Sequence, residues 1–208
     1  MLYLANPCSS EAVRAAMGAQ TIGYIDTPAQ GNRRPPGVVW CADNGRFGKG
    51  WPGPEKWFDW LTRNAGDAGS CLFATAPDVV GDAAATLEES LPWLPKIRAL
   101  GYPAAFVAQD GLEDLVTPWE EFDVLFLGGS TEWKLGAAAR VLVAEAKARG
   151  KRVHMGRVNS EKRYRYALGI GCDSADGTYL TFGPDVNLPD VLAWSRNADQ
   201  YALFGAAL

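Results

Sequence analysis

The sequence predicts an α/β fold in which eight parallel strands, each followed by a helical or connecting segment, close into a barrel. Eight apolar runs of four or five residues alternate with such segments along the 208 residues. Most of these runs end at an aspartate, a glutamine or a pair of glycines. The phosphate-binding pattern G-x-x-x-x-G-K-[ST] does not occur, and the match to G-x-G-x-x-G at Gly48–Gly53 does not directly follow an expected strand. We therefore expect a minimal (β/α)8 TIM barrel, a single domain over residues 1–208, rather than an open doubly wound sheet.

Four strands are expected in the first part of the chain: Leu2–Ala5, Thr21–Ile25, Val38–Ala42 and Cys71–Thr75. A helix is expected to begin at a capping serine, Ser9 or Ser10, and to end near Met17. The proline-, glycine- and arginine-rich stretch 27–37 is too polar and too broken to be core, so we expect a loop there. A second helix is expected over 54–63, where four apolar side chains fall on one side.

Four more strands are expected further along the chain: Ala104–Ala108, Asp123–Leu127, Arg152–Met155 and Ile170–Asp173. A helix over 82–100 precedes them, and Pro92 and Pro95 are expected to kink or split it. Three further helices are expected between and after these strands: Glu132–Arg149, Ser160–Leu168 and Leu188–Phe204.

Composition restricts the classes of function. The net charge of -4 argues against bulk attraction to nucleic acid or to an anionic membrane, so any nucleic-acid contact needs a local basic patch. No apolar run approaches the roughly 18 residues of a membrane span. The first residues lack the basic start and long apolar stretch of a signal peptide. We expect a cytoplasmic protein without a membrane partner.

Metal binding is not predicted. The four cysteines include no C-x-x-C pair, and the chain has one histidine, His154. Structural zinc sites usually show close ligand pairs, so we expect reduced, mostly buried thiols instead. His154 lies in an expected strand, which favours a buried, hydrogen-bonded imidazole.

A candidate site lies where the expected strands end, because chemistry in such barrels occurs at the carboxyl ends of the strands. Carboxylates and an amide there suit a ligand rich in N–H donors and carbonyls, such as a purine-like base. Glycines let the ligand approach the backbone closely. A carboxylate below an anomeric carbon can act as a nucleophile, and a second can carry the proton of the leaving group. The candidate residues are Asp43, Phe47, Asp78, Gln109, Gly128, Gly129, Met155, Gly156, Asp173 and Asp176.

Six segments in this order resemble the tRNA-guanine transglycosylase family, and in particular its small phage-type relatives that place 7-deazaguanines in DNA. The resemblance covers about Val38 to Thr178, and no single segment would be specific by itself. The segments are Asp43-Asn44-Gly45-Arg46-Phe47, Pro77-Asp78-Val79-Val80, Val107-Ala108-Gln109-Asp110-Gly111, Leu127-Gly128-Gly129-Ser130, His154-Met155-Gly156 and Gly171-Cys172-Asp173-Ser174-Ala175-Asp176.

This resemblance implies a role for each candidate residue. Asp176 would be the nucleophile that attacks C1′ of a guanine nucleotide, and Asp173 a supporting residue. Asp43 would handle the proton. Phe47 and Met155 would stack on the two faces of the base. The remaining positions would read its edge, through side chains or through the backbone: Asp78, Gln109, Gly128, Gly129 and Gly156.

Departures from the family narrow the expected substrate. The family's C-x-C-x-x-C…H zinc module follows the nucleophile, whereas here no cysteine follows Cys172 and no histidine follows His154. That module helps to hold tRNA, so the resemblance implies DNA rather than tRNA as the polynucleotide partner. The incoming base would be a 7-deazaguanine such as 7-cyano-7-deazaguanine (preQ0), with the 7-substituent left open. Neither a metal nor an organic cofactor is implied.

A set of basic residues completes the expectation. Those near the strand ends could line a track for phosphates, and the set is Arg33, Arg34, Arg46, Lys49, Arg157, Lys162 and Arg163. The alternative for such a set is an ordinary solvated surface.

Two other functions stay open at this stage. One is an N-glycoside hydrolase acting on a free nucleoside, which would use the same carboxylates with water as the acceptor. The other is a non-catalytic binder of a deazapurine or of nucleic acid. Asp176 also has a simpler interpretation, as a turn residue before Gly177. The sequence does not specify an oligomeric state.

Overall fold

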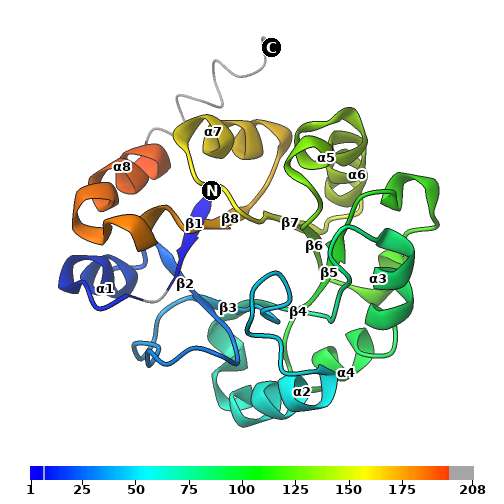
Figure 1. Ribbon diagram of the computed structural model, residues 1–208, viewed down its shortest axis with the longest axis horizontal. Coiled ribbons are helices and arrows are strands. Elements are labelled where there is room, and N and C mark those ends of the chain that lie inside the picture. The colour runs from blue at the N-terminus through cyan, green and yellow to red at the C-terminus, as the bar shows by residue number, and fades with distance from the viewer. Residues whose placement is uncertain (7, 197–208) are drawn as a thin grey trace.

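The computed structural model describes residues 1–6 and 8–196, and eight parallel strands in it form a closed barrel (Figure 1). Each strand pairs with the next one in the sequence, and β8 pairs with β1 to close the ring. This confirms the predicted fold class. The strands are β1 (Leu2–Ala5), β2 (Gly23–Asp26), β3 (Trp40–Ala42), β4 (Cys71–Thr75), β5 (Ala104–Ala108), β6 (Val124–Leu127), β7 (Arg152–Met155) and β8 (Ser174–Gly177).

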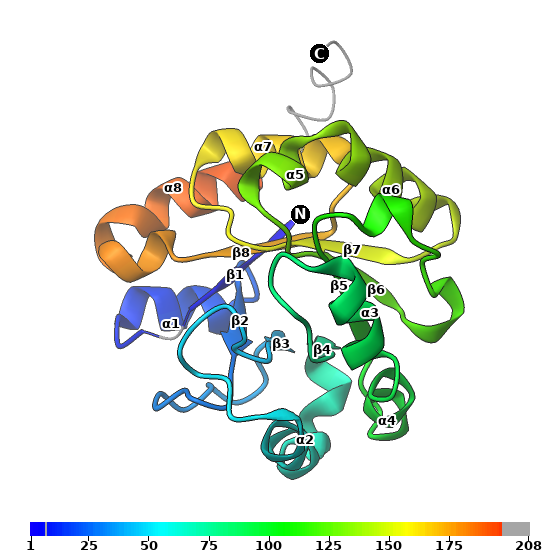
Figure 2. The ribbon, with the colours of Figure 1, turned by 45° about the vertical axis from the view of Figure 1, so that its right-hand side comes forward.

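Helices surround this ring of strands, as Figure 2 shows from an oblique direction. The α-helices are α1 (Glu11–Gly18), α2 (Pro54–Arg63), α3 (Ala83–Ser90), α4 (Leu94–Ala99), α5 (Thr131–Leu135), α6 (Ala137–Ala148), α7 (Glu161–Ile170) and α8 (Pro184–Arg196). Short 3-10 helices are η1 (Ala65–Ser70), η2 (Leu112–Asp114), η3 (Trp119–Glu121) and η4 (Tyr179–Phe182). None of the helices in the described residues is long and apolar enough to cross a membrane.

Local sequence signals explain most helix boundaries. Side chains of Ser10, Asp82, Ser130 and Ser160 accept a hydrogen bond from a backbone N–H in the first turn of α1, α3, α5 and α7. The predicted helix over 82–100 is split into α3 and α4, as its prolines suggested. The predicted helix Glu132–Arg149 is also two helices, because the chain leaves helical geometry at Gly136. Of the last predicted helix, residues 197–204 lie outside the described residues.

Side chains alternate between the inside of the barrel and the layer beneath the helices. The interior cluster is Leu4, Ile25, Cys41, Phe73, Ala105, Val107, Val124 and Phe126. Neighbouring strand residues such as Trp40, Leu125 and Leu127 belong to the outer cluster, which packs against the helices. This period of two is what a strand dictates, so each strand carries one fixed set of residues toward the interior.

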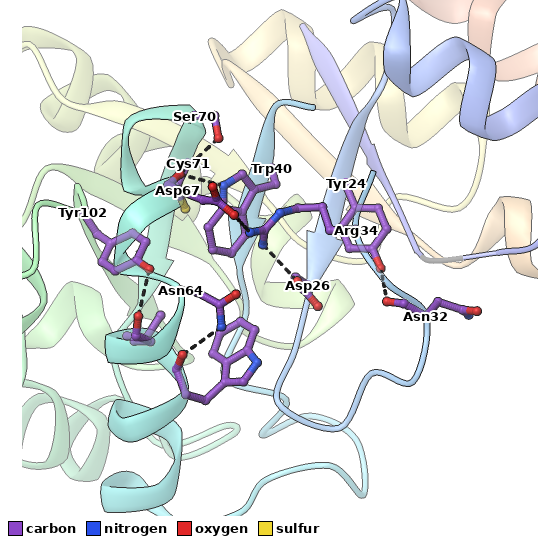
Figure 3. A network of polar contacts seen from close by, with 12 residues as sticks. Tyr24, Asp26, Asn32, Arg34, Trp40, Asn64, Asp67, Ser70, Cys71 and Tyr102 are labelled. Carbon is purple, nitrogen blue, oxygen red and sulfur yellow. Dashed lines mark hydrogen bonds and ion pairs between the residues drawn. The ribbon is translucent and has the colours of Figure 1, made fainter. Parts of the chain in front are cut away.

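The connection between β2 and β3 contains no helix, and Arg34 packs there against the outside of the barrel (Figure 3). Its guanidinium carbon lies 3.6 Å from the centroid of the Trp40 ring. The same guanidinium bonds Asp26 at 3.0 Å and Asp67 at 2.6 Å. The Tyr24 hydroxyl donates to the carbonyl of Asn32 in the same loop. Arg34 therefore ties the loop to the strands and to η1.

The last strand differs from the prediction. Ile170–Asp173 was expected to be a strand, but Ile170 ends α7 and Gly171 caps that helix with a φ of 102°. Glycine adopts this left-handed conformation at little cost, and it is common after a helix. The strand follows at Ser174–Gly177, with its residues Ser174 and Asp176 in register with Leu2 and Leu4 of β1. The prediction of strand Ile170–Asp173 is therefore wrong.

Candidate active site

A pocket of about 540 Å³ opens at the carboxyl ends of the strands. Residues at or just beyond the end of every strand line it, as expected for a barrel of this kind. They include seven of the ten predicted site residues, which are Asp43, Phe47, Asp78, Gln109, Gly128, Gly156 and Asp176, and two of the predicted cations, Arg157 and Arg163. The pocket is also lined by Asn6, Thr27, Asn44, Thr75, Asn159 and Thr178.

Asp176 projects from β8 into the pocket and is oriented by a buried histidine. Its Oδ1 lies 2.9 Å from Nε2 of His154, whose Nδ1 lies 2.9 Å from the hydroxyl of Ser174. With Asp176 ionised, Nε2 has to carry the proton, so Nδ1 accepts from the serine. His154 is fully buried and contacts the rings of Phe73 and Phe126. The predicted buried, hydrogen-bonded role of this histidine is thus confirmed, and the arrangement fixes the carboxylate of Asp176.

Asp43 follows β3 and is the carboxyl group best suited to hold a proton near neutral pH. Burial raises the pKa of Asp43 to about 7, and the nearby charges of Asp176 and Asp78 act in the same direction. A hydrogen bond of 2.7 Å from the backbone N–H of Gly45 opposes the rise. A group with a pKa in this range can both donate and accept a proton, which general acid–base catalysis requires.

Asp78 is buried and held by two amide side chains. Its Oδ1 accepts from Nδ2 of Asn44 at 2.8 Å, and its Oδ2 accepts from Nε2 of Gln109 at 2.7 Å. Burial raises the pKa of Asp78, while the two hydrogen bonds lower it. The side-chain oxygen of Gln109, Oε1, in turn accepts from the backbone N–H of Gly81 at 3.0 Å. Strand ends β3, β4 and β5 thus supply one connected polar wall.

Asn44 is a site residue that the sequence did not single out. It is buried, its backbone N–H donates to the Thr75 hydroxyl, and its side chain donates to Asp78 and to the carbonyl of Ala76. Its position directly after Asp43 was the available signal. In the sequence, however, Asn44-Gly45 has the composition of an ordinary turn, which hid its buried role.

The predicted glycines lie where backbone and side chains approach too closely for a Cβ atom. A Cβ at Gly128 would lie 2.4 Å from Cγ1 of Val107 and 3.1 Å from Nε2 of Gln109. A Cβ at Gly156 would lie 2.9 Å from the Phe126 ring and 3.4 Å from Oδ1 of Asp176. Gly129 is crowded by Asp110 and Trp133, and it does not line the pocket itself. Larger residues at Gly128 or Gly156 would therefore push into the site.

Lys134 of α5 lies behind the end of β7 and was not predicted. It is only 4% exposed, and its Nζ donates to the carbonyl of Gly156. Burial lowers the pKa of Lys134 to about 7, and the charge of Arg157 lowers it further. Its ammonium group fixes the backbone of Gly156 next to Asp176. In the sequence it is one of several basic residues in an apparently amphipathic helix, so nothing distinguished it.

Besides Gly129, two predicted site residues do not line the pocket, Met155 and Asp173. Met155 is buried in the outer cluster, because its neighbours in the strand, His154 and Gly156, face the interior. It is therefore not available to stack on a base in the pocket.

Asp173 precedes β8 and lies at the opposite end of the barrel. It pairs with Lys147 at 2.8 Å and accepts from the N–H of Val153 at 2.7 Å. Its backbone N–H and C=O bond the starts of β7 and β1. Asp173 joins the amino ends of three strands and does not support Asp176.

The predicted basic set divides into four groups. Arg157 and Arg163 line the pocket, whereas Lys49 and Lys162 are exposed residues of a rim loop and of α7. Arg46 forms an ion pair with Glu89 at 3.2 Å, which partly neutralises it. Arg34 is held by Asp26 and Asp67 on the outside of the barrel, and Arg33 lies in the same loop. Arg34 is therefore a structural residue, which the loop's composition alone could not reveal.

No group of three or more histidine, cysteine, aspartate or glutamate side chains in residues 1–6 and 8–196 is arranged to hold a metal ion.

Comparison with known proteins supports the fold. No family model and no curated protein matches the chain. Among solved structures, the Amycolatopsis orientalis BexX/CysO complex contains a chain that is 18% identical, with a TM-score of 0.57, covering 98% of this chain and 88% of that one. Tryptophan synthase from M. tuberculosis gives 17% identity, a TM-score of 0.55 and coverage of 97% and 92%. For 3-hexulose-6-phosphate synthase from Salmonella typhimurium the values are 17%, 0.51, 99% and 100%. At such identities the likeness is one of fold, and the chain shares the barrel architecture of these proteins.

Proposed function

We propose that this protein is a transglycosylase that exchanges guanine in a polynucleotide, DNA in preference to tRNA, for a 7-deazaguanine base. The observation that carries the proposal is that three carboxyl groups lie in one pocket and that each has a different environment. Asp176 is oriented by His154, Asp43 has a pKa of about 7, and Asp78 is held by two amides. In active sites, neighbouring carboxyl groups whose environments push their pKa values apart typically take different roles, one as the acid–base group and another as the nucleophile.

Asp176 is the nucleophile in this proposal. Its Oδ1 is bonded by His154, which leaves Oδ2 to attack C1′ of the target nucleotide. The new bond forms between Oδ2 and C1′ while the bond from C1′ to N9 of guanine breaks, and the electron pair leaves with the base. The result is a covalent glycosyl ester on Asp176.

Asp43 carries the proton in both halves of the exchange. It gives its proton to guanine as the base leaves, and it then takes the N9 proton of the incoming 7-deazaguanine. The nitrogen of that base attacks C1′ and expels the Asp176 carboxylate. Asp43 therefore regains in the second half the proton that it gave in the first, and a pKa of about 7 suits both steps.

Base recognition falls to the polar wall of Asp78 and Gln109. Their carboxylate and amide groups match the donors and the carbonyl of a guanine edge. Asn44 and Gly81 orient them through the hydrogen bonds described above. Gly128 allows the base to approach the backbone beside Gln109.

The polynucleotide in this proposal is bound by the cations at the rim of the pocket. Arg163 lines the pocket, and Lys49 and Lys162 are exposed beside it. Phosphate contacts of this kind position a polynucleotide without reading its sequence. A target nucleotide in a duplex would have to be flipped out to reach Asp176. The preference for DNA rests on the resemblance described above.

The test is base exchange with purified protein. Guanine-containing duplex DNA and, separately, tRNA are incubated with 7-cyano-7-deazaguanine and digested to nucleosides, which are analysed by mass spectrometry. We expect the modified deoxynucleoside from the wild type. Asp176→Asn should reduce its formation at least about a thousandfold. Asp173→Asn is the matched control, because it removes the same charge at the other end of the barrel, and it should remain active.

The other outcomes identify different functions. Modified ribonucleoside would indicate a tRNA enzyme. Release of free guanine without insertion would indicate a hydrolase. Base binding without any product from DNA, tRNA or nucleosides would contradict the proposal and favour a binder.

A further inference from the structure

Two side chains from opposite sides of the barrel meet at the pocket mouth. Phe47 follows β3 and Arg157 follows β7, which are four strands apart in a ring of eight. The guanidinium carbon of Arg157 lies 4.3 Å from the centroid of the Phe47 ring. Both residues line the pocket, and Phe47 is otherwise 64% exposed. Their contact spans the opening through which a ligand enters.

Arg157 is also anchored to the wall beside the predicted base-reading residues. Its Nη2 donates to the carbonyl oxygens of both Gly128 and Gly129. Gly128 adjoins Gln109, since a Cβ at Gly128 would lie 3.1 Å from the glutamine nitrogen. A planar group rich in N–H donors thus lies over an aromatic ring and donates to two backbone acceptors.

These are the contacts that a guanine-type base would make. Guanine is likewise planar and rich in N–H donors, and with N1–H on Asp78 as proposed, a hydrogen of its 2-amino group is left for a carbonyl of this wall. A base stacked on this face of Phe47 needs a separation of about 4.5 Å or more between ring centroids. The guanidinium already occupies that space at 4.3 Å. A base therefore cannot use this face of Phe47 until Arg157 has left it.

The backbone at Arg157 is held on both sides, so its displacement from Phe47 is a movement of the side chain. Its φ is 62°, in the left-handed region, which side-chain-bearing residues adopt infrequently. Residues in such conformations persist where surrounding contacts hold them, and they are often found at ligand clamps. Here the N–H groups of Gly156 and Val158 donate to the carbonyls of Leu127 and Asp176 and hold the backbone. The guanidinium is held by Phe47 and the two glycine carbonyls, and an arriving base would replace those contacts.

We infer that Arg157 is a place-holder, whose guanidinium occupies the base's stacking and hydrogen-bonding positions in the free protein and is displaced by the incoming base. This inference rests on the proposed function for the identity of the base. Of the two predicted stacking residues only Phe47 lines the pocket, and its ring contacts Arg157 in the free protein and the base in the complex. The displaced cation is released at the pocket mouth beside Arg163, where the polynucleotide phosphates are expected.

The test is the affinity for free base without any polynucleotide. Calorimetric titration with guanine and with 7-cyano-7-deazaguanine would compare the wild type with Arg157→Ala. Removing the competing group should tighten binding about tenfold, because the apparent dissociation constant falls as the open fraction rises. Arg63→Ala, which removes an exposed arginine at the end of α2 and outside the pocket, is the matched control and should bind the base as the wild type does.

A second measurement uses the vacated position. Methylguanidinium ion at millimolar concentration should weaken base binding to Arg157→Ala and leave the wild type unaffected, because it occupies the place that the side chain held. Arg157→Gly serves as a second variant. It removes the side chain and suits the left-handed backbone, so it should fold at least as well as the alanine variant.

Two results would overturn the inference, and they differ in what they say of the proposed function. If the wild type binds the base but neither variant binds it more tightly, Arg157 is not a place-holder, while the proposed base site stands. If folded wild type and Arg63→Ala bind neither base, the place-holder inference and the proposed function both fail.

Discussion

Replacing Asp43 with asparagine should make the protein more stable above neutral pH while abolishing base exchange. Burial raises the pKa of this carboxyl from its usual value of about 3.9 to about 7 in the folded state. The folded state therefore holds the proton more tightly than the unfolded state does. Stability from this group is fully present below the unfolded pKa and is lost as the pH rises through the folded pKa.

The magnitude follows from the two pKa values. About pH 5 lies about 1 unit above the pKa of the unfolded state, so the carboxyl is mostly ionised when unfolded and still protonated when folded. This difference lowers the free energy of unfolding by about 1.5 kcal/mol. At about pH 8 this loss of unfolding free energy approaches its limit of about 4 kcal/mol. Between these values the wild type should lose about 2 to 3 kcal/mol from this one group. The variant should lose none there, because asparagine does not titrate and its Oδ1 can still accept from Gly45.

Urea unfolding at the two pH values measures this directly. Asp82→Asn is the matched control: Asp82 caps α3 on the surface, and asparagine is an equally good capping residue. That variant should follow the wild type at both pH values. The reasoning would be refuted if Asp43→Asn were less stable than the wild type at about pH 8. It would also be refuted if the difference between the two proteins were the same at both values.

Three further predictions separate structural from functional residues. Arg34→Ala should lower the free energy of unfolding by about 2 to 4 kcal/mol, because Asp26, which is almost buried, loses its ion-pair partner. Chemical denaturation measures this change, and the affinity for DNA should stay the same. Gly128→Ala should weaken base binding at least about tenfold in calorimetric titration, since its Cβ would displace the Gln109 amide; unchanged affinity would exclude this wall as the base site. Asp173→Asn should cost about 1 kcal/mol of stability by urea unfolding with exchange activity intact, because its partly exposed ion pair lies far from the pocket.

Much of the fold could be predicted from the sequence because short buried strands and capped helices leave strong local signals. Strands β1, β4, β5 and β7 have the predicted bounds, and the serine caps and prolines marked several helix ends. The error at β8 has a local cause. Ile170 and Cys172 are apolar and flank a glycine, which suits a buried strand as well as it suits the end of a helix. Only the pairing with β1 and β7 distinguishes the two.

The network around Arg34 could not be predicted for a different reason. Asp26, Asp67 and Trp40, its three partners, come from a strand, a 3-10 helix and another strand. Their meeting depends on the closed barrel and on the absence of a helix between β2 and β3. In the sequence, Arg33-Arg34 is simply a basic pair in a polar loop, so exposure to phosphate was as reasonable an expectation as burial.

The misassignment of Met155 was avoidable, and the reason also supports the rest of the site. In each strand the residues that face the interior continue in steps of two beyond the strand end. Val107 leads to Gln109, Phe126 to Gly128, and His154 to Gly156.

The same step leads from Ser174 to Asp176 in β8, so all four strand ends deliver one residue to the pocket. Met155 belongs to the opposite set, and a methionine there cannot face a ligand unless His154 turns outward. The histidine is fixed inside the barrel by Ser174 and Asp176. The hydrogen bonds that orient the proposed nucleophile therefore also exclude Met155 from the pocket. Phe47 remains as the stacking residue, in contact with Arg157 in the free protein and, in our inference, with the base in the complex.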